Sequence, residues 1–292
     1  MGEDLPALLA GTDVILVDSP GFAGELEAGY QAALAALGPG VDPSRPGVNI
    51  DGVSLSDPFF EGNIAEVSGM LRTAGIPVAT VFSRDWSEMA RHAAPLTIGT
   101  NDDFASGVGK YLGGTLGIPA LRATFRDLGD RIEGADVEPV LSGLDFQEER
   151  IVSACDRYLR RHDPPSVTIF AGAAYARFAA EILRQYLDAG ILFVGTRNAP
   201  PKNPQVPFRM EKATGLELVA EKIHELSPDL VIGSSFEQSV SPGSAFHGII
   251  PPLNGQVRLT HPPLAGTGGT LRFMEEILNT CMDCRKDPSG PK

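Results

Sequence analysis

The chain has 292 residues, 42% hydrophobic and 21% charged, the composition of a globular protein long enough for two domains with their own cores. Its 24 basic residues against 37 acidic ones give a formal net charge of −13, which argues against nucleic acid and anionic membranes as partners. No stretch approaches the roughly 20 apolar residues of a membrane-spanning helix, the N-terminus lacks a secretory signal pattern, and three cysteines suit a reducing compartment. We therefore expect a cytoplasmic protein.

The N-terminal part of the chain predicts a helix, a strand and a second helix. The elements are the end of a helix at Gly2–Leu9, a short buried strand at Asp13–Val17, a loop at residues 18–24 and an alanine-rich helix at Glu25–Leu37. Residues 38–47 are dense in glycine and proline, which indicates a domain boundary.

From Val48 the pattern restarts as alternating strands and helices. The predicted strands are Val48–Val53, Pro77–Phe82, Leu96–Gly99 and Pro119–Ala123, and the helices between them are Gly62–Ala74, Trp86–His92 and Asp103–Leu116. Residues 126–141 give a weak signal, and we interpret them as a connection.

A third block begins with a long helix at Asp145–Arg161. It continues with strands Val167–Ala171, Ile191–Gly195, Leu230–Ile232 and a strand ending at Thr260, and with helices Tyr175–Ala189, Gly215–Leu226 and Thr270–Cys281. Alternation at this spacing predicts βαβ units and parallel sheets. The expected fold class is α/β, with two complete doubly wound units and a remnant of a third.

Small-residue turns follow several of the predicted strands. They are Gly172-Ala173-Ala174, residues 195–198 and Gly233-Ser234-Ser235. Small residues let a backbone approach a ligand, and a helix N-terminus offers free N–H donors to an anion. No turn matches a dinucleotide fingerprint or a P-loop, so each is also compatible with an ordinary tight connection.

The histidines and cysteines are the remaining candidates for chemistry. Of five histidines, His261 is the one that directly follows a predicted strand, where open α/β sheets place their ligands. A histidine that only packs in the fold is the alternative. Cys281 and Cys284 have a spacing that suits a metal, but one such pair at a helix end is equally an incidental exposed pair. Cys155 is expected in the core.

In their order along the chain, these segments resemble the nitrogenase component 1 family, which includes the subunits of nitrogenase and of dark-operative protochlorophyllide reductase. The matching segments are Gly2–Leu5, Val17–Gly24, Val48–Ile50, Glu61–Glu66, Gly117–Pro119, Asp229–Ser234, Arg258–His261 and Gly266–Asn279. They cover nearly the whole chain. The resemblance implies three Rossmann-like domains, here residues 1–43 with 262–292 as the remnant of the first, residues 44–140 as the second and residues 141–261 as the third.

The resemblance also implies particular site residues. His261 matches the histidine that ligates the metal cofactor of catalytic nitrogenase α-subunits, and the partner cysteine of that site falls at Asn101 by counting back from Gly117. A cysteine ligand of the interface cluster falls at Ser19. A neutral amide is a poor substitute for a thiolate, and serine rarely ligates iron. With Gly233, Ser234 and Ser235, these residues form the predicted cofactor site, with His261 as the expected metal ligand.

The family chemistry implies a reductase subunit with an iron–sulfur cluster or related metallocofactor. It would work in a homo- or hetero-oligomer with another component 1-type subunit and receive electrons from an ATP-dependent iron protein. The family's other cysteines precede the Gly2 segment, so we expect an N-terminally truncated member, one that uses a partner's cysteines, or one without the cluster.

Two further hypotheses stay open. One is a non-catalytic scaffold or partner that keeps the fold and carries no metal cluster of its own. The other is a two-lobed small-molecule binding protein that closes about a hinge. The sequence does not identify the substrate.

Overall fold

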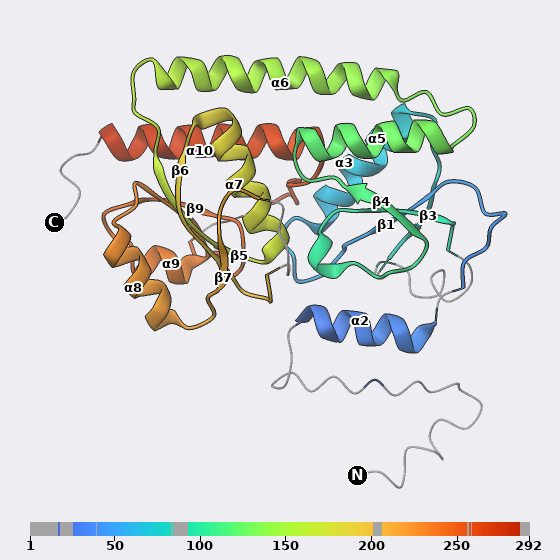
Figure 1. The fold of residues 1–292 in the computed structure, drawn as a ribbon, viewed down its shortest axis with the longest axis horizontal. Helices are drawn as coiled ribbons and strands as arrows, with labels where there is room; N and C mark the ends of the chain where they lie inside the picture. The colour runs from blue at the N-terminus through green and yellow to red at the C-terminus, as the bar shows by residue number, and fades with distance from the viewer. Residues whose placement is uncertain are drawn as a thin grey trace, which may run out of the picture.

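The computed structural model describes residues 17, 26–38, 40–82, 84, 93–200, 206–255, 257 and 259–286. Two parallel sheets lie side by side, one in each half of the molecule (Figure 1). The first, in the order β2-β1-β3-β4, consists of β1 (Val48–Asp51), β2 (Val78–Val81), β3 (Leu96–Gly99) and β4 (Lys110–Gly114). The second, in the order β7-β6-β5-β8-β9, consists of β5 (Ser166–Ala171), β6 (Gly190–Thr196), β7 (Met210–Lys212), β8 (Leu230–Gly233) and β9 (Ala245–Gly248). We call the two halves the first and second lobes.

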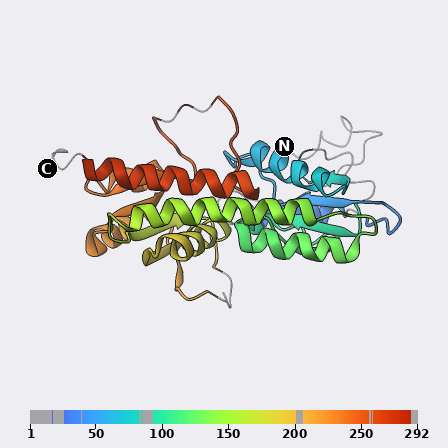
Figure 2. The ribbon, with the colours of Figure 1, turned by 90° about the horizontal axis from the view of Figure 1, so that it is seen from above.

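Helices cover both sheets, and two long ones cross from lobe to lobe. The helices are α2 (Leu26–Leu37), α3 (Phe60–Thr73), the 3₁₀ helix η1 (Asp102–Phe104), α5 (Ile118–Arg131), α6 (Glu138–Leu159), α7 (Ala173–Leu187), α8 (Leu216–Leu226), α9 (Ser235–Ser239) and α10 (Gly266–Lys286). Figure 2 shows α6 and α10 side by side along the molecule. Helix α10 contacts α3 and α5 of the first lobe and β9 of the second.

The strand order of each sheet confirms the predicted α/β fold with Rossmann-like units. In the first sheet the order reverses between β1 and β3, and in the second between β5 and β8. Every residue of β1 and β8 is buried, as expected for central parallel strands covered on both faces. Ligands of such sheets bind where the strand order reverses, at the carboxyl ends of the strands.

Two predicted elements of the first lobe are wrong. The predicted helix Asp103–Leu116 is η1 followed by β4, and the predicted strand Pro119–Ala123 belongs to α5. Gly107 and Gly109 both have φ of +72°, a conformation that no right-handed helix contains. Gly117 stands at the N-cap of α5 with proline in its first turn, which is a helix-start pattern. The weak segment 126–141 contains the end of α5, a connection at residues 132–137 and the start of α6.

The predicted strand ending at Thr260 is also wrong. The segment is irregular at its described residues, and Val257 and Leu259 are 88% and 93% exposed. The strand that extends the sheet is β9, which pairs with β8. Strand propensity reflects packing on a pleated, half-buried surface, and these two side chains have no such surface. His261 therefore lies on the segment that leads into α10.

Some predictions lie outside the described residues: the helix at Gly2–Leu9, the strand at Asp13–Val17 apart from Val17, Ser19 and the helix at Trp86–His92. In the described part of the chain, none of the helices combines the length and apolar character needed to cross a lipid bilayer.

Candidate functional site between the lobes

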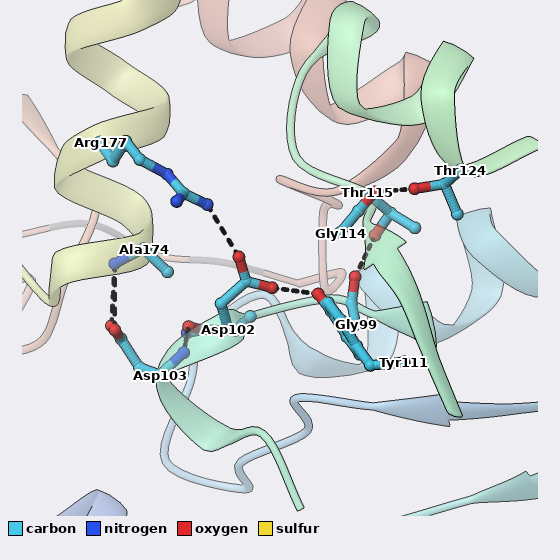
Figure 3. Close-up of polar contacts among 10 residues, drawn as sticks. Gly99, Asp102, Asp103, Tyr111, Gly114, Thr115, Thr124, Ala174 and Arg177 are labelled. Atoms are coloured by element: carbon cyan, nitrogen blue, oxygen red, sulfur yellow. Dashed lines mark hydrogen bonds and ion pairs between the residues drawn. The ribbon is translucent and has the colours of Figure 1, made fainter. Parts of the chain in front are cut away.

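The carboxyl ends of the central strands of the two sheets meet between the lobes. After β3, the carboxylate of Asp103 accepts a hydrogen bond from the N–H of Ala174 at the start of α7, with both oxygens at 3.1 Å. The neighbouring carboxylate of Asp102 pairs with Arg177 of α7 at 2.8 Å. Figure 3 shows both contacts crossing from η1 to α7. The two places where strand order reverses therefore face each other.

The N-terminus of α7 is already occupied by side-chain oxygens. Asn198 Oδ1 accepts from the N–H of Ala173 at 2.8 Å, and Asp103 accepts from the next N–H. Gly172 allows this approach, since a Cβ there would lie 2.5 Å from Asp103 Oδ2. Burial raises the pKa of Asp103, while hydrogen bonds from Asn198 and Ala174 act in the opposite direction. This end of α7, which favours an anion, holds a carboxylate from the other lobe.

Asp102 lies between Tyr111 and Arg177 (Figure 3). The Tyr111 hydroxyl donates to Asp102 Oδ1, and the guanidinium donates to Oδ2 at 2.8 Å. Burial, followed by the charge of Asp102, raises the pKa of Tyr111 far above its ordinary value, so the phenol stays a neutral donor. Thr115 donates to the carbonyl of Gly99 at 2.9 Å, which fixes the end of β3 that carries this group.

Asn101, the residue matched to the family's cysteine, is 5% exposed. Its side-chain oxygen accepts from the N–H of Asp103 at 3.0 Å and caps η1. Its interaction with Tyr175 lowers the pKa of that phenol, against the larger effect of burial, which raises it. The amide oxygen therefore fixes the turn between β3 and η1.

Tyr175 and Asn63 join four segments in one buried network. The Tyr175 hydroxyl donates to Asp57 and accepts from Asn63 Nδ2 at 3.1 Å. Asn63 Oδ1 accepts from the N–H groups of Leu264 and Ala265 at 2.7 and 2.8 Å. Burial, then the charge of Asp57, raises the pKa of Tyr175 well above its ordinary value, so it remains protonated. The segment that carries His261 is thereby connected to α7 through α3.

His261 lies on the surface against α3. Its Nε2 is 3.4 Å from Glu61 Oε2, and the two side chains are 51% and 58% exposed. The edge of its ring meets Phe60, with ring centroids 5.7 Å apart. Its backbone touches α3 so closely that a Cβ on Gly62 would lie 2.3 Å from the His261 carbonyl oxygen. The imidazole is therefore accessible to solvent.

The Gly233–Ser235 turn serves the second lobe's own fold. Ser234 caps α9 in a capping box, with its N–H and hydroxyl 2.7 and 2.6 Å from Glu237 Oε2. A Cβ on Gly233 would lie 2.8 Å from the same oxygen. Glu237 also pairs with Arg197, and Ser235 Oγ accepts from the Asn254 N–H at 2.6 Å. In the structure, this turn forms a tight connection between β8 and α9.

Several polar residues that meet at or near the contact between the lobes are not among the site residues predicted from the sequence patterns above. They are Asp102, Asp103, Tyr175, Asn63 and Glu61, and an acidic pair that follows strand Leu96–Gly99 after two intervening residues was a signal for the first two. Cys155 and Cys281 are buried and Cys284 is exposed. Within the described ranges, no group of three or more histidine, cysteine or acidic side chains is placed to hold a metal ion.

Comparisons with known proteins agree with this architecture. The family model described as nitrogenase component 1 type oxidoreductase matches residues 1–282. The nitrogenase iron-molybdenum cofactor biosynthesis protein NifE of Clostridium pasteurianum is 29% identical over 204 residues, which cover 64% of this chain and 44% of that protein, so the chain spans less than half of this relative. The solved structure of nitrogenase Cp1 at pH 6.5 superposes with a TM-score of 0.76 at 15% identity, over 99% of this chain and 72% of that one, and shows the same fold.

Proposed function

Because the chain belongs to the nitrogenase component 1 type oxidoreductase family, we propose that it is a scaffold-type member that holds a metal–sulfur cluster as cargo. His261 is the protein ligand in this proposal, and a second component 1-type subunit completes the assembly. The similar NifE protein is named for cofactor biosynthesis, which supports a role in carrying a cluster rather than in turning over a substrate. The domain boundaries at residues 43, 140 and 261 and a cytoplasmic location are part of the same proposal.

The proposal rests on the environment of the Asn101 side chain. At the position matched to a thiolate ligand stands a buried amide whose oxygen accepts a hydrogen bond from the N–H of Asp103. A neutral amide is a poor ligand for a soft iron centre, whereas an imidazole is a good one. The pair therefore does not fit a resident cofactor of the thiolate–imidazole kind. One exposed imidazole suits cargo that must arrive and leave.

The accessible imidazole of His261 is also compatible with a second function, that of a catalytic reductase subunit. A catalytic subunit would receive electrons from an ATP-dependent iron protein and reduce a small molecule between the lobes. His261 favours this candidate because it is retained and half exposed. Its clusters would draw their cysteine ligands from a partner subunit. The two candidates differ in whether the cluster leaves the protein.

Anaerobic purification of the chain with its co-purifying partners tests both candidates. The scaffold function predicts stoichiometric iron and sulfide in the complex, an EPR signal, and transfer of the cluster to an apo acceptor protein. The His261→Ala variant should assemble normally and retain little cluster. Sustained substrate reduction with the iron protein and ATP, without cluster loss, would favour the reductase. Absence of stoichiometric iron from both the chain and its complex would rule out the two together.

A further inference from the structure

Glu61 and His261 present a carboxylate and an imidazole to the same patch of solvent. Glu61 lies in the first turn of α3, and His261 lies 200 positions later on the segment before α10. Their facing atoms, Oε2 and Nε2, are 3.4 Å apart. Each side chain is more than half exposed, at 58% and 51%, so both donor atoms can be reached from outside.

The separation of the two atoms suits a shared metal ion better than a hydrogen bond. A charge-assisted N–H···O bond between such groups is about 2.7–2.9 Å long. Two donors that each bind one tetrahedral metal ion at about 2.0–2.1 Å lie about 3.4 Å from each other. The observed 3.4 Å therefore matches one edge of a coordination tetrahedron. The ligands need no large rearrangement to reach a common ion.

The backbone that carries both donors is held in one rigid unit. Gly62, next to Glu61, packs against the carbonyl of His261 with no room for a Cβ. Asn63 accepts two N–H groups from residues 264 and 265, and Glu66 accepts the N–H of Gly268 at 2.7 Å. Consecutive turns of α3 therefore hold residues 261–268 in place. A preformed pair of ligands on fixed backbone loses little freedom when a metal arrives.

Phe60 packs against the imidazole of His261. Its ring meets His261 edge to face, at 62° between the ring planes. Edge-to-face pairs of this kind are favourable, so the contact stabilises the observed position of the imidazole. An unsupported surface histidine would sample several rotamers.

We propose that Glu61 and His261 form a two-point binding site for a divalent transition-metal ion such as Fe²⁺, Co²⁺ or Zn²⁺. Imidazole and carboxylate together suit these borderline ions. Two protein ligands leave coordination positions open for water, for sulfide of a cluster or for a partner's side chain, unlike a closed structural site with four protein ligands. The inference rests on the proposed function for the nature of the cargo, but the metal ion alone tests the site.

Co²⁺ titration of the full-length chain, followed by visible absorption and calorimetry, measures this site directly. A Cys284→Ser background removes the exposed thiol. We expect one Co²⁺ per chain, affinity at least tenfold lower in Glu61→Gln, and loss of binding in His261→Gln. Glu61→His, which replaces one good ligand with another, should restore the affinity. Glu133→Gln and His224→Gln remove an exposed carboxylate and an exposed imidazole elsewhere and should bind as the parent does.

Unchanged affinity in Glu61→Gln would show that Glu61 is not a ligand. Equal affinity in all variants would place the metal elsewhere and overturn the site. The metal-free melting temperatures of these surface variants should equal that of the parent, which separates lost binding from lost folding. Co²⁺ binding that depends on Glu61 and His261 in a protein that never carries a cluster would leave the site standing and reject the proposed function.

Discussion

Asp103 is the residue whose ionisation ties the contact between the lobes to pH. It faces Asp102, Arg177 and Asn198, and burial raises its pKa above the ordinary 3.8. Because the pKa of Asp103 is higher in the folded state than in the unfolded state, the folded state favours the neutral carboxyl over the carboxylate. Its contribution to stability is therefore full below 3.8 and is lost as the pH rises through the folded-state pKa.

The Asp103→Asn variant tests this coupling. The amide oxygen can still accept from Ala174, but the side chain no longer titrates. We expect the free energy of unfolding of Asp103→Asn to fall less between pH 4 and pH 7 than that of the parent, as measured by urea denaturation. Asp103→Ala should lose about 1–2 kcal/mol at pH 7, because the first turn of α7 loses a cap. Asp130→Ala, on the exposed side of α5, is the matched control, and the same pH profile in Asp103→Asn and the parent would contradict the prediction.

Helix α3 holds the segment before α10, and two of its glycines make this testable. A Cβ at Gly62 would meet the backbone of His261, Pro262 and Pro263 at 2.3–2.5 Å, whereas a Cβ at Gly69 has no neighbour within 4 Å. Both residues lie inside α3, so alanine improves helix propensity equally at both. The difference between the two variants therefore measures the contact.

We expect Gly62→Ala to lower the free energy of unfolding by about 1–3 kcal/mol, because backbone atoms must shift to admit the methyl group. Gly69→Ala should raise it by about 0.5–1 kcal/mol. Thermal and urea unfolding at one pH provide the measurement. Equal stability of the two variants would show that residues 261–263 move away from α3 at little cost.

At the scale of elements, the sequence predicted the helices and strands that are determined by residues close together along the chain. Buried apolar runs located β5 and β8, and helical spacing located α3, α7 and α8 within one or two residues. The helix predicted at residues 103–116 was wrong because glycines of this segment adopt positive φ in a loop and a strand. The spacing of apolar residues carries no information about such backbone conformations. The strand predicted to end at Thr260 was wrong because an apolar segment forms a strand only where a neighbouring strand can pair with it and cover its side chains.

At the scale of the whole molecule, the candidate site was only partly predictable. A sheet with alternating βα units places its ligands at the carboxyl ends of its strands, and Asn101 and the Gly233 turn do follow the ends of β3 and β8. The contact of Asp103 with α7 depends on how one lobe sits on the other, and the pairing of Glu61 with His261 joins residues 200 positions apart. Neither follows from local pattern.

The lobes are joined along their length by α6 and α10, and we expect the described fold to unfold as one unit. Phe273 of α10 is 2% exposed and packs on Phe178 of α7, with ring centroids 5.1 Å apart, while α10 also contacts α3 and α5. Calorimetry should show one transition with equal calorimetric and van't Hoff enthalpies. Phe273→Ala should lower stability by about 3–5 kcal/mol and leave the transition single, because the lost contact supports both lobes. Phe236→Ala, at a 53% exposed site, should change stability little. Two resolved transitions, in the parent or in Phe273→Ala, would mean that the lobes fold independently and that the bridging helices follow only one of them.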